Sequence, residues 1–209
     1  MIQEPVVILA NGDFPSHKEP LSILENSSTI ICCDGSVNKL IKNGIEPHYI
    51  LGDMDSIDDN LKNKYIERII ELPNQNENDL RKTINWAQDQ GIKQALILGA
   101  TGKRDDHSLA NIFTLLQYSS LLEIVMYTNH GLFSVVQGKQ KFDSFKGQKI
   151  SLFAIDSDIE ITSNDLKYRM NSTKLNTLYY GSLNESLNDN ISITLSHGKI
   201  LIYQVFACK

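Results

Sequence analysis

The segment Tyr49-Ile50-Leu51-Gly52-Asp53-Met54-Asp55-Ser56 joins the end of an apolar run to two carboxylates one residue apart. The apolar run predicts a buried strand that ends at the glycine. Two ionised carboxylates held close together repel each other unless a cation lies near them. Mg2+ prefers oxygen ligands and is usually held by one or two carboxylates together with substrate phosphates. The segment therefore predicts a metal and phosphate site at Asp53 and Asp55, although Asp-x-Asp after a glycine is also common in ordinary turns.

Similar apolar runs recur before and after this segment, and helical patterns separate them. Strands are predicted at 6–10, 29–33, 47–51, 68–72, 95–98 and 123–127. One intervening helix is expected to begin with Ser36 as its N-cap. The last helix is expected to bury the stripe Leu109, Ile112, Phe113 and Leu116. Strands alternating with helices predict an α/β fold: a mostly parallel, Rossmann-like sheet with flanking helices.

Polar residues follow nearly every predicted strand of this part. They are Asp13, Asp34, Asp53 with Asp55, the 75–79 loop, and Arg104 with Asp106. Ligands of an open parallel sheet bind beyond the carboxyl ends of its strands, so these groups should converge on one side. The 99–106 loop suits an anion because it exposes backbone N–H groups and because Arg104 can bind phosphate oxygens in pairs. The pattern favours an active site at this edge, and the alternative is a solvated acidic rim.

The pattern changes after residue 132, where helical periodicity fades. Short strands are predicted at 133–136, 148–155, 159–162, 178–180, 191–195 and 199–206. His197-Gly198 is typical of a hairpin turn between the last two. Frequent short strands and turns predict an antiparallel β-sandwich. We therefore expect two domains, an α/β domain at 1–132 and a β-rich domain at 133–209.

Composition excludes several classes of protein. The net charge of -5 disfavours nucleic-acid binding through many phosphate contacts. No apolar run approaches the roughly 20 residues of a membrane span. Three cysteines, two of them adjacent, are neither a disulfide framework nor a zinc site. The first residues do not have the pattern of a secretory signal. We expect a cytoplasmic protein with no nucleic-acid or membrane partner.

Several motifs taken as a set resemble the thiamine pyrophosphokinase family. They are Asp34-Gly35-Ser36 with Asn38, Gly52-Asp53-Met54-Asp55-Ser56, Gln75 with Asp79 and Lys82, and the segment 102–111. Leu166-Lys167-Tyr168 and the segment 181–185 agree more loosely. The chain also departs from the family pattern. Lys103 and Asp165 replace usual glycines, Asn78 replaces a usual threonine, and Leu183 interrupts a usual Ser-Asn pair.

The resemblance implies transfer of the pyrophosphoryl group of ATP to thiamine, with Mg2+, to give thiamine diphosphate and AMP. It implies metal ligation by Asp53, Asp55, Asp34 and Asp79, and catalytic roles for Asp53, Asp55, Asp79, Asp106 and Gln75. The ATP-binding residues would be Asp34, Lys82, Arg104, His107, Asn111, Thr101 and Gly102, and those for thiamine Ser182 and Asn184. Asp106 or Asp79 could accept the proton of the attacking hydroxyl. The second domain would bind thiamine and form a homodimer.

Two other functions remain open from the sequence. One is a different metal-dependent nucleotide or nucleotide-sugar transferase that uses Asp53 and Asp55. The other is a thiamine or nucleotide sensor that has kept the site without the chemistry.

Overall fold

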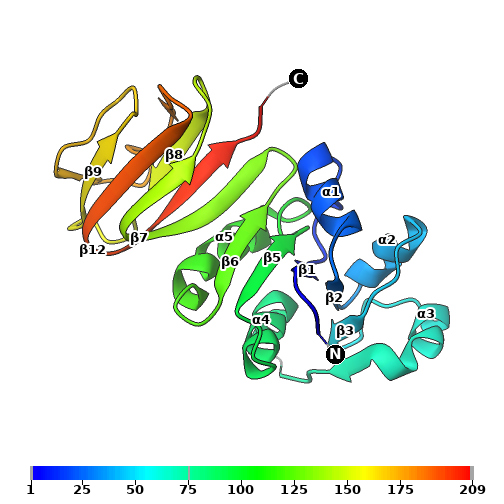
Figure 1. Cartoon of the computed structure of the whole chain (residues 1–209). Helices are drawn as coiled ribbons and strands as arrows, with labels where there is room; N and C mark the ends of the chain where they lie inside the picture. The colour runs from blue at the N-terminus through cyan, green and yellow to red at the C-terminus, as the bar shows by residue number, and fades with distance from the viewer. Residues whose placement is uncertain (1, 75, 208–209) are drawn as a thin grey trace. The chain divides into compact units, whose positions relative to one another are not determined.

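The computed structural model describes residues 2–74 and 76–207. The chain divides into two compact units, of which unit 1 ends at Asn129 and unit 2 begins at His130. Figure 1 traces both units along the chain from blue to red. Each unit has its own buried apolar residues, so each is described by itself.

Unit 1 is built on a parallel sheet. Its strands are β1 (Val6–Leu9), β2 (Thr29–Cys33), β3 (Tyr49–Gly52), β4 (Ile69–Glu71), β5 (Gln94–Leu98) and β6 (Glu123–Tyr127). They pair in the order β6-β5-β1-β2-β3-β4, and each of these pairs is parallel. The chain moves outward from β1 to β4 and then continues on the other side of β1 with β5. The strand order therefore reverses between β1 and β5, which is where open α/β sheets bind their ligands.

Helices connect these strands and cover the sheet. They are α1 (Lys18–Glu25), α2 (Ser36–Lys42), α3 (Asp59–Lys64), the 3-10 turn η1 (Ile66–Arg68), α4 (Asp79–Asp89) and α5 (Asp105–Tyr118). Successive strand residues point to opposite faces. In β2, Cys32 packs in the cluster that contains Leu24 of α1, whereas the Cys33 Sγ lies 3.3 Å from Thr83 Oγ1 of α4. Both faces of the strand are thus buried, which explains its continuous apolar sequence.

Two local predictions for unit 1 are wrong. Ser36 is the first residue of α2 and does not cap it, because its hydroxyl donates to the Leu9 carbonyl at 2.8 Å. The predicted apolar stripe of α5 is not the buried face, since Leu109 is 58% exposed. The buried residues of that helix are Asn111, Thr114, Leu115 and Tyr118. The helix is turned so that the Asn111 amide reaches the Ala100 carbonyl, 2.8 Å away.

Unit 2 is antiparallel. Its strands are β7 (Gly131–Asp143), β8 (Lys149–Phe153), β9 (Glu160–Asn164), β10 (Thr173–Lys174), β11 (Asn184–Glu185) and β12 (Asn190–Val205). β12 pairs along β7, and it also pairs with β9 near its start and with β8 near its end. The predicted hairpin at His197-Gly198 is therefore wrong, because these residues lie within β12 at a shift in its register with β7. The predicted strand at 178–180 is also wrong, since this segment is a turn.

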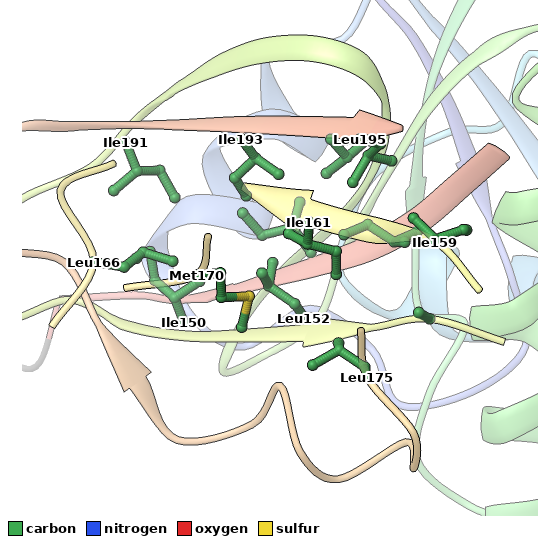
Figure 2. Packing of buried hydrophobic residues seen from close by; sticks show 14 residues of the cluster. Ile150, Leu152, Ile159, Ile161, Leu166, Met170, Leu175, Ile191, Ile193 and Leu195 are labelled. Carbon is green, nitrogen blue, oxygen red and sulfur yellow. The ribbon is translucent and has the colours of Figure 1, made fainter. Parts of the chain in front are cut away.

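The core of unit 2 forms where these strands face each other. Figure 2 shows Ile150 and Leu152 of β8 on one side of the cluster and Ile191 and Ile193 of β12 on the other, with Ile161 of β9 between them. All five are at most 1% exposed. A packed layer between antiparallel strands is the arrangement expected for a β-sandwich. Within the described residues, we find no helix with the length and apolar character needed to cross a membrane.

Candidate active site

A cavity of about 340 Å³ opens in unit 1 where the strand order reverses. Its walls come from the segments that follow β1, β2, β3 and β5 and from the first turns of α4 and α5. The residues that line it are Ala10, Asn11, Gly12, Cys33, Asp34, Ser56, Asn78, Asp79, Leu80, Ala100, Gly102, Lys103, Arg104, His107 and Asn111. Of the polar residues that were expected to converge at the strand ends, Asp34, Asp79 and Arg104 line this cavity.

Three carboxylates meet at this place. Asp34 follows β2, Asp53 follows β3 and Asp79 begins α4, and each offers an oxygen within 4.8 Å of the others. The Lys82 ammonium lies 2.9 Å from Asp79 Oδ1 and 3.8 Å from Asp53 Oδ2, and its side chain is only 4% exposed. We call these four side chains the acidic group. One ammonium beside three carboxylates leaves the acidic group with a net negative charge.

The acidic group has the properties of a site for a divalent cation. Asp34 is 3% exposed, and its Oδ1 is buried with no hydrogen-bond partner among the described residues. Its Oδ2 accepts a hydrogen bond from the Ser56 N–H at 3.1 Å. A buried acceptor without a partner is costly, because the group has lost its water and gained nothing in exchange. Carboxylate oxygens are the ligands that Mg2+ prefers, so the residues present fit this ion.

Burial also changes the acidity of this group. It raises the pKa of the Asp79 carboxyl, and the nearby Asp53 and Asp34 carboxylates raise the pKa further, while Lys82 opposes the shift. The physical cause is that a negative charge is hard to place where water is excluded and other negative charges are close. A divalent cation bound here would remove that penalty.

Backbone geometry explains how the segment after β3 delivers its carboxylates. Gly52 has φ 152°, and a Cβ on it would lie 2.8 Å from the Asp34 Cβ, so the close approach of β2 and β3 requires a glycine. Met54 has φ 66° and is 2% exposed. Its side chain packs into the core of unit 1, although its two sequence neighbours are Asp53 and Asp55. Asp53 joins the acidic group, whereas Asp55 is exposed and lies outside it.

Arg104 and Asp106 form an ion pair at the rim of the cavity. Arg104 Nε lies 3.1 Å from Asp106 Oδ1, and its Nη2 lies 2.5 Å from Oδ2. Both side chains are more than half exposed. The hydrogen bonds from Arg104 lower the pKa of Asp106 to about 2. Asp106 is therefore a weak base, and Arg104, which also lines the cavity with His107, already has an anionic partner.

Asn111 joins three segments of the cavity wall. Its Oδ1 accepts from Asn78 Nδ2 at 2.9 Å, and its Nδ2 donates to the Ala100 carbonyl at 2.8 Å. Asn78 in turn caps α4, since its Oδ1 accepts from the Arg81 N–H at 3.0 Å. The Asn111 amide thus uses both ends to order its surroundings. Asn78 was not among the site residues predicted from the sequence, although its position before an apolar helical run is the signal of an N-cap.

The loops after β1 and β5 are tied together, and sequence reasoning missed part of this contact. The Gly12 N–H donates to the Gly99 carbonyl at 2.6 Å, and the Asp13 N–H donates to the Thr101 carbonyl at 2.8 Å. Gly102 has φ 82°, and a Cβ there would collide with the Asp13 carboxylate. Asn11, Gly12 and Lys103 line the cavity but were not predicted as ligand residues. The available signal was the place of Asn11 and Gly12 just after a buried strand and of Lys103 in the loop between a strand and a helix.

The remaining predicted residues lie elsewhere. Gln75 falls outside the described residues. Ser182 and Asn184 belong to unit 2, where Asn184 is 2% exposed. Asn184 Nδ2 donates to the Tyr168 carbonyl at 2.8 Å, and Asn184 Oδ1 accepts from the N–H groups of Tyr168 and Glu185 at 3.0 and 2.9 Å. The Ser182 hydroxyl donates to the Tyr179 carbonyl at 2.6 Å. Both side chains therefore bind the backbone of their own unit.

Comparisons with known proteins place these features in a family. A sequence model described as thiamin pyrophosphokinase, catalytic domain, matches residues 21–126. A second, described as thiamin pyrophosphokinase, substrate-binding domain, matches residues 131–203. The chain belongs to the thiamin pyrophosphokinase family. The resemblance seen in the motifs is confirmed, and so are the enzyme class and the ATP-dependent formation of thiamine diphosphate as its reaction.

Individual relatives agree with this assignment. The chain is 25% identical over 192 residues to thiamin pyrophosphokinase 1 of Caenorhabditis elegans, covering 84% of this chain and 77% of that protein. It is 25% identical over 200 residues to thiamine pyrophosphokinase 2 of Arabidopsis thaliana, covering 81% and 74%.

Solved structures share the fold. Thiamin pyrophosphokinase from Candida albicans superposes with a TM-score of 0.83 at 19% identity, over 98% of this chain and 90% of that one. Thiamine pyrophosphokinase from Bacillus subtilis gives 0.81 at 20% identity, over 97% and 99%. The predicted fold class is thereby confirmed.

Proposed function

We propose that the chain transfers the pyrophosphoryl group of ATP to thiamine at the cavity of unit 1, with Mg2+ held by the acidic group. The observation that carries the metal assignment is the buried Asp34 Oδ1, which has no hydrogen-bond partner among the described residues and lies in a group of three carboxylates. When bound, Mg2+ would neutralise charge on the phosphates. Asp55, which follows Asp53 by two residues, would be a further metal ligand, and Gln75 would be a catalytic residue.

The protein's own part in this chemistry is to position groups and balance charge. Lys82 holds the Asp79 and Asp53 carboxylates in place while it offsets part of their repulsion. Gly102 and Arg104 of the loop after β5 and His107 of the first turn of α5 would face the phosphates, and Thr101 and Asn111 fix that loop. Asp34 contributes to both metal and ATP binding.

Asp79 fits the role of proton acceptor better than Asp106. It lies on the cavity wall, within reach of a hydroxyl that would bind in the cavity. Asp106 is exposed and paired with Arg104, and its pKa of about 2 makes it a poor base.

We place thiamine on unit 2, near Ser182 and Asn184, and propose a homodimeric, cytoplasmic enzyme. The match of 131–203 to a substrate-binding domain supports this location for thiamine. Because the Asn184 amide is hydrogen-bonded to backbone groups of Tyr168, it would shape the thiamine site, whereas Ser182, which is partly exposed, would contact thiamine directly.

The test is to incubate the purified protein with ATP, thiamine and Mg2+ and to follow AMP and thiamine diphosphate by chromatography. Controls omit one component at a time, and one sample replaces Mg2+ with EDTA. We expect the two products in equal amounts and none with EDTA. ADP with thiamine monophosphate would overturn the pyrophosphoryl transfer, and undiminished product in EDTA would overturn the metal assignment. Turnover of a nucleotide sugar instead would favour the alternative transferase.

A further inference from the structure

We propose that Lys103 binds a phosphate of ATP and supplies a cationic subsite separate from Lys82 and Arg104. Lys103 lies in the loop after β5 and lines the same cavity as Asp34 and Asp79. This inference rests on the proposed use of the cavity for ATP. It adds a residue that the sequence motifs did not mark for ligand binding.

The first argument comes from the partners of each cation. Lys82 contacts Asp79 and Asp53, and Arg104 contacts Asp106, so both predicted phosphate-binding cations are already paired with carboxylates. The Lys103 ammonium instead lies 2.8 Å from a neutral oxygen, Asn11 Oδ1. No ion pair involves Lys103 within residues 2–74 and 76–207. Its charge is therefore available to an anion in the cavity.

A second ammonium lies beside it. Lys39 of α2 donates to the Gly12 carbonyl at 2.6 Å, next to the Asn11 that holds Lys103. Partial burial lowers the pKa of Lys39, and the charge of Lys103 lowers it further, while Asp13 opposes the shift. Two ammonium groups close enough to repel each other are stabilised when an anion binds between or beside them. The wall made by the loops after β1 and β5 is thus cationic, whereas the acidic group suits the metal that accompanies a polyphosphate.

The backbone supports a role for the side chain of Lys103. Its φ is 57°, in the left-handed region that residues with a Cβ rarely adopt and that glycine adopts freely. The part of the loop that precedes Lys103 is also held in place, by the Gly12 N–H on the Gly99 carbonyl and the Asp13 N–H on the Thr101 carbonyl. A glycine would suit this position better for folding alone. The backbone conformation therefore does not explain a lysine at this position, whereas a role for its ammonium in the cavity does.

These features allow a variant that separates binding from folding. Lys103→Gly removes the ammonium at a backbone position that favours glycine, so we expect unchanged or increased thermal stability. Hydrogen bonds to charged groups contribute enough that the KM for ATP should rise about 10-fold. The KM for thiamine should stay the same. Lys103→Gln keeps a side chain of similar reach and should show the same rise, and Lys42→Gln, an exposed lysine in the last turn of α2, serves as the matched control.

Direct binding then locates the contact independently of turnover. Calorimetry with Mg2+ and without thiamine compares ATP, ADP, AMP and adenosine on the wild type, Lys103→Gly and Lys103→Gln. We expect a weaker affinity for ATP in the variant and no change for adenosine. Unchanged ATP affinity in both Lys103 variants, or an equal loss for adenosine, would overturn the proposal. A wild type that binds ATP but forms no thiamine diphosphate would count against the proposed reaction and leave the test of Lys103 intact.

Discussion

The cavity of unit 1 and the segment 182–185 of unit 2 both contain polar residues that the sequence marks for ligand binding, yet these residues use their polar atoms differently. In unit 1, Asp34 keeps a buried oxygen without a hydrogen-bond partner in the described part of the chain. In unit 2, Asn184 is equally buried, but its amide makes three hydrogen bonds to backbone groups. The same degree of burial thus accompanies an acceptor without a hydrogen-bond partner in the described part of unit 1 and a fully bonded amide in unit 2.

The largest expected effect tests the first half of this comparison. Asp53→Asn replaces a carboxylate of the acidic group with a neutral amide of the same shape. Losing one electrostatic contact of this kind at the reacting phosphates should lower kcat by about 100- to 1,000-fold at fixed Mg2+. The matched control is Asp89→Asn, an exposed acid at the end of α4 that should keep wild-type turnover. Near wild-type kcat in Asp53→Asn would mean that the acidic group does not serve the reaction.

The second prediction tests the structural role of Asn184. Asn184→Ala removes three hydrogen bonds and leaves the Tyr168 carbonyl and two N–H groups without them. Unsatisfied buried groups are costly, so the free energy of unfolding should fall by about 2–3 kcal/mol in urea titrations. Ser182→Ala, which loses one hydrogen bond, should cost under about 1 kcal/mol. If Asn184→Ala raised the KM for thiamine and left stability unchanged, the contrast between the two units would fail.

The third prediction concerns the cation inside the acidic group. Lys82→Met keeps an unbranched side chain, one atom shorter, but leaves Asp79 and Asp53 without its charge. Breaking a fully buried pair costs about 3–5 kcal/mol, and because both carboxylates are partly exposed we expect about 2 kcal/mol. Unfolding measured with and without Mg2+ should show a smaller loss when the ion is present, since it replaces the missing positive charge. An equal loss under both conditions would contradict metal binding at this place.

The smallest effect is a difference in titration between Asp79 and Asp106. Burial raises the pKa of Asp79 in the folded protein, so the folded state holds that proton more tightly than the unfolded chain. Its contribution to stability is therefore lost as pH rises from the ordinary value of about 4 through the raised one. Asp106 behaves in the opposite way, because its pKa is lowered to about 2 and its contribution is lost as pH falls toward that value.

Carboxyl carbon NMR of the metal-free protein measures both directly. Asp106 should titrate near 2 and Asp79 above the ordinary range, with Asp79→Asn and Asp106→Asn as assignments. A pKa of Asp79 below that of Asp106 would contradict both assignments, since Asp106 would then be the better proton acceptor.

Sequence patterns predicted some elements well and others poorly, for identifiable reasons. Strands buried on both faces, such as Thr29–Cys33, leave continuous apolar runs, and this strand was predicted with its observed bounds. The helical period of α5 was also correct, but its buried face was not, because Asn111 is drawn inward by the Ala100 carbonyl. The hairpin turn predicted at Gly198 is wrong because a glycine is as common at an irregularity inside a long strand as at a turn, and here its φ of 64° lies at a register shift of β12.

The sequence by itself determined the order of the elements, the parallel sheet of unit 1 and the acids at its strand ends, since periodicity and residue type are local properties of the chain. The tertiary structure decided which acids meet. Asp79 comes from the start of α4 and joins Asp34 and Asp53, while Asp55, adjacent in sequence to the core residue Met54, stays exposed. It also decided which cations are already paired, leaving Lys103 held by Asn11 across a separation of 92 residues. Such contacts depend on the packing of distant segments, which no local pattern records.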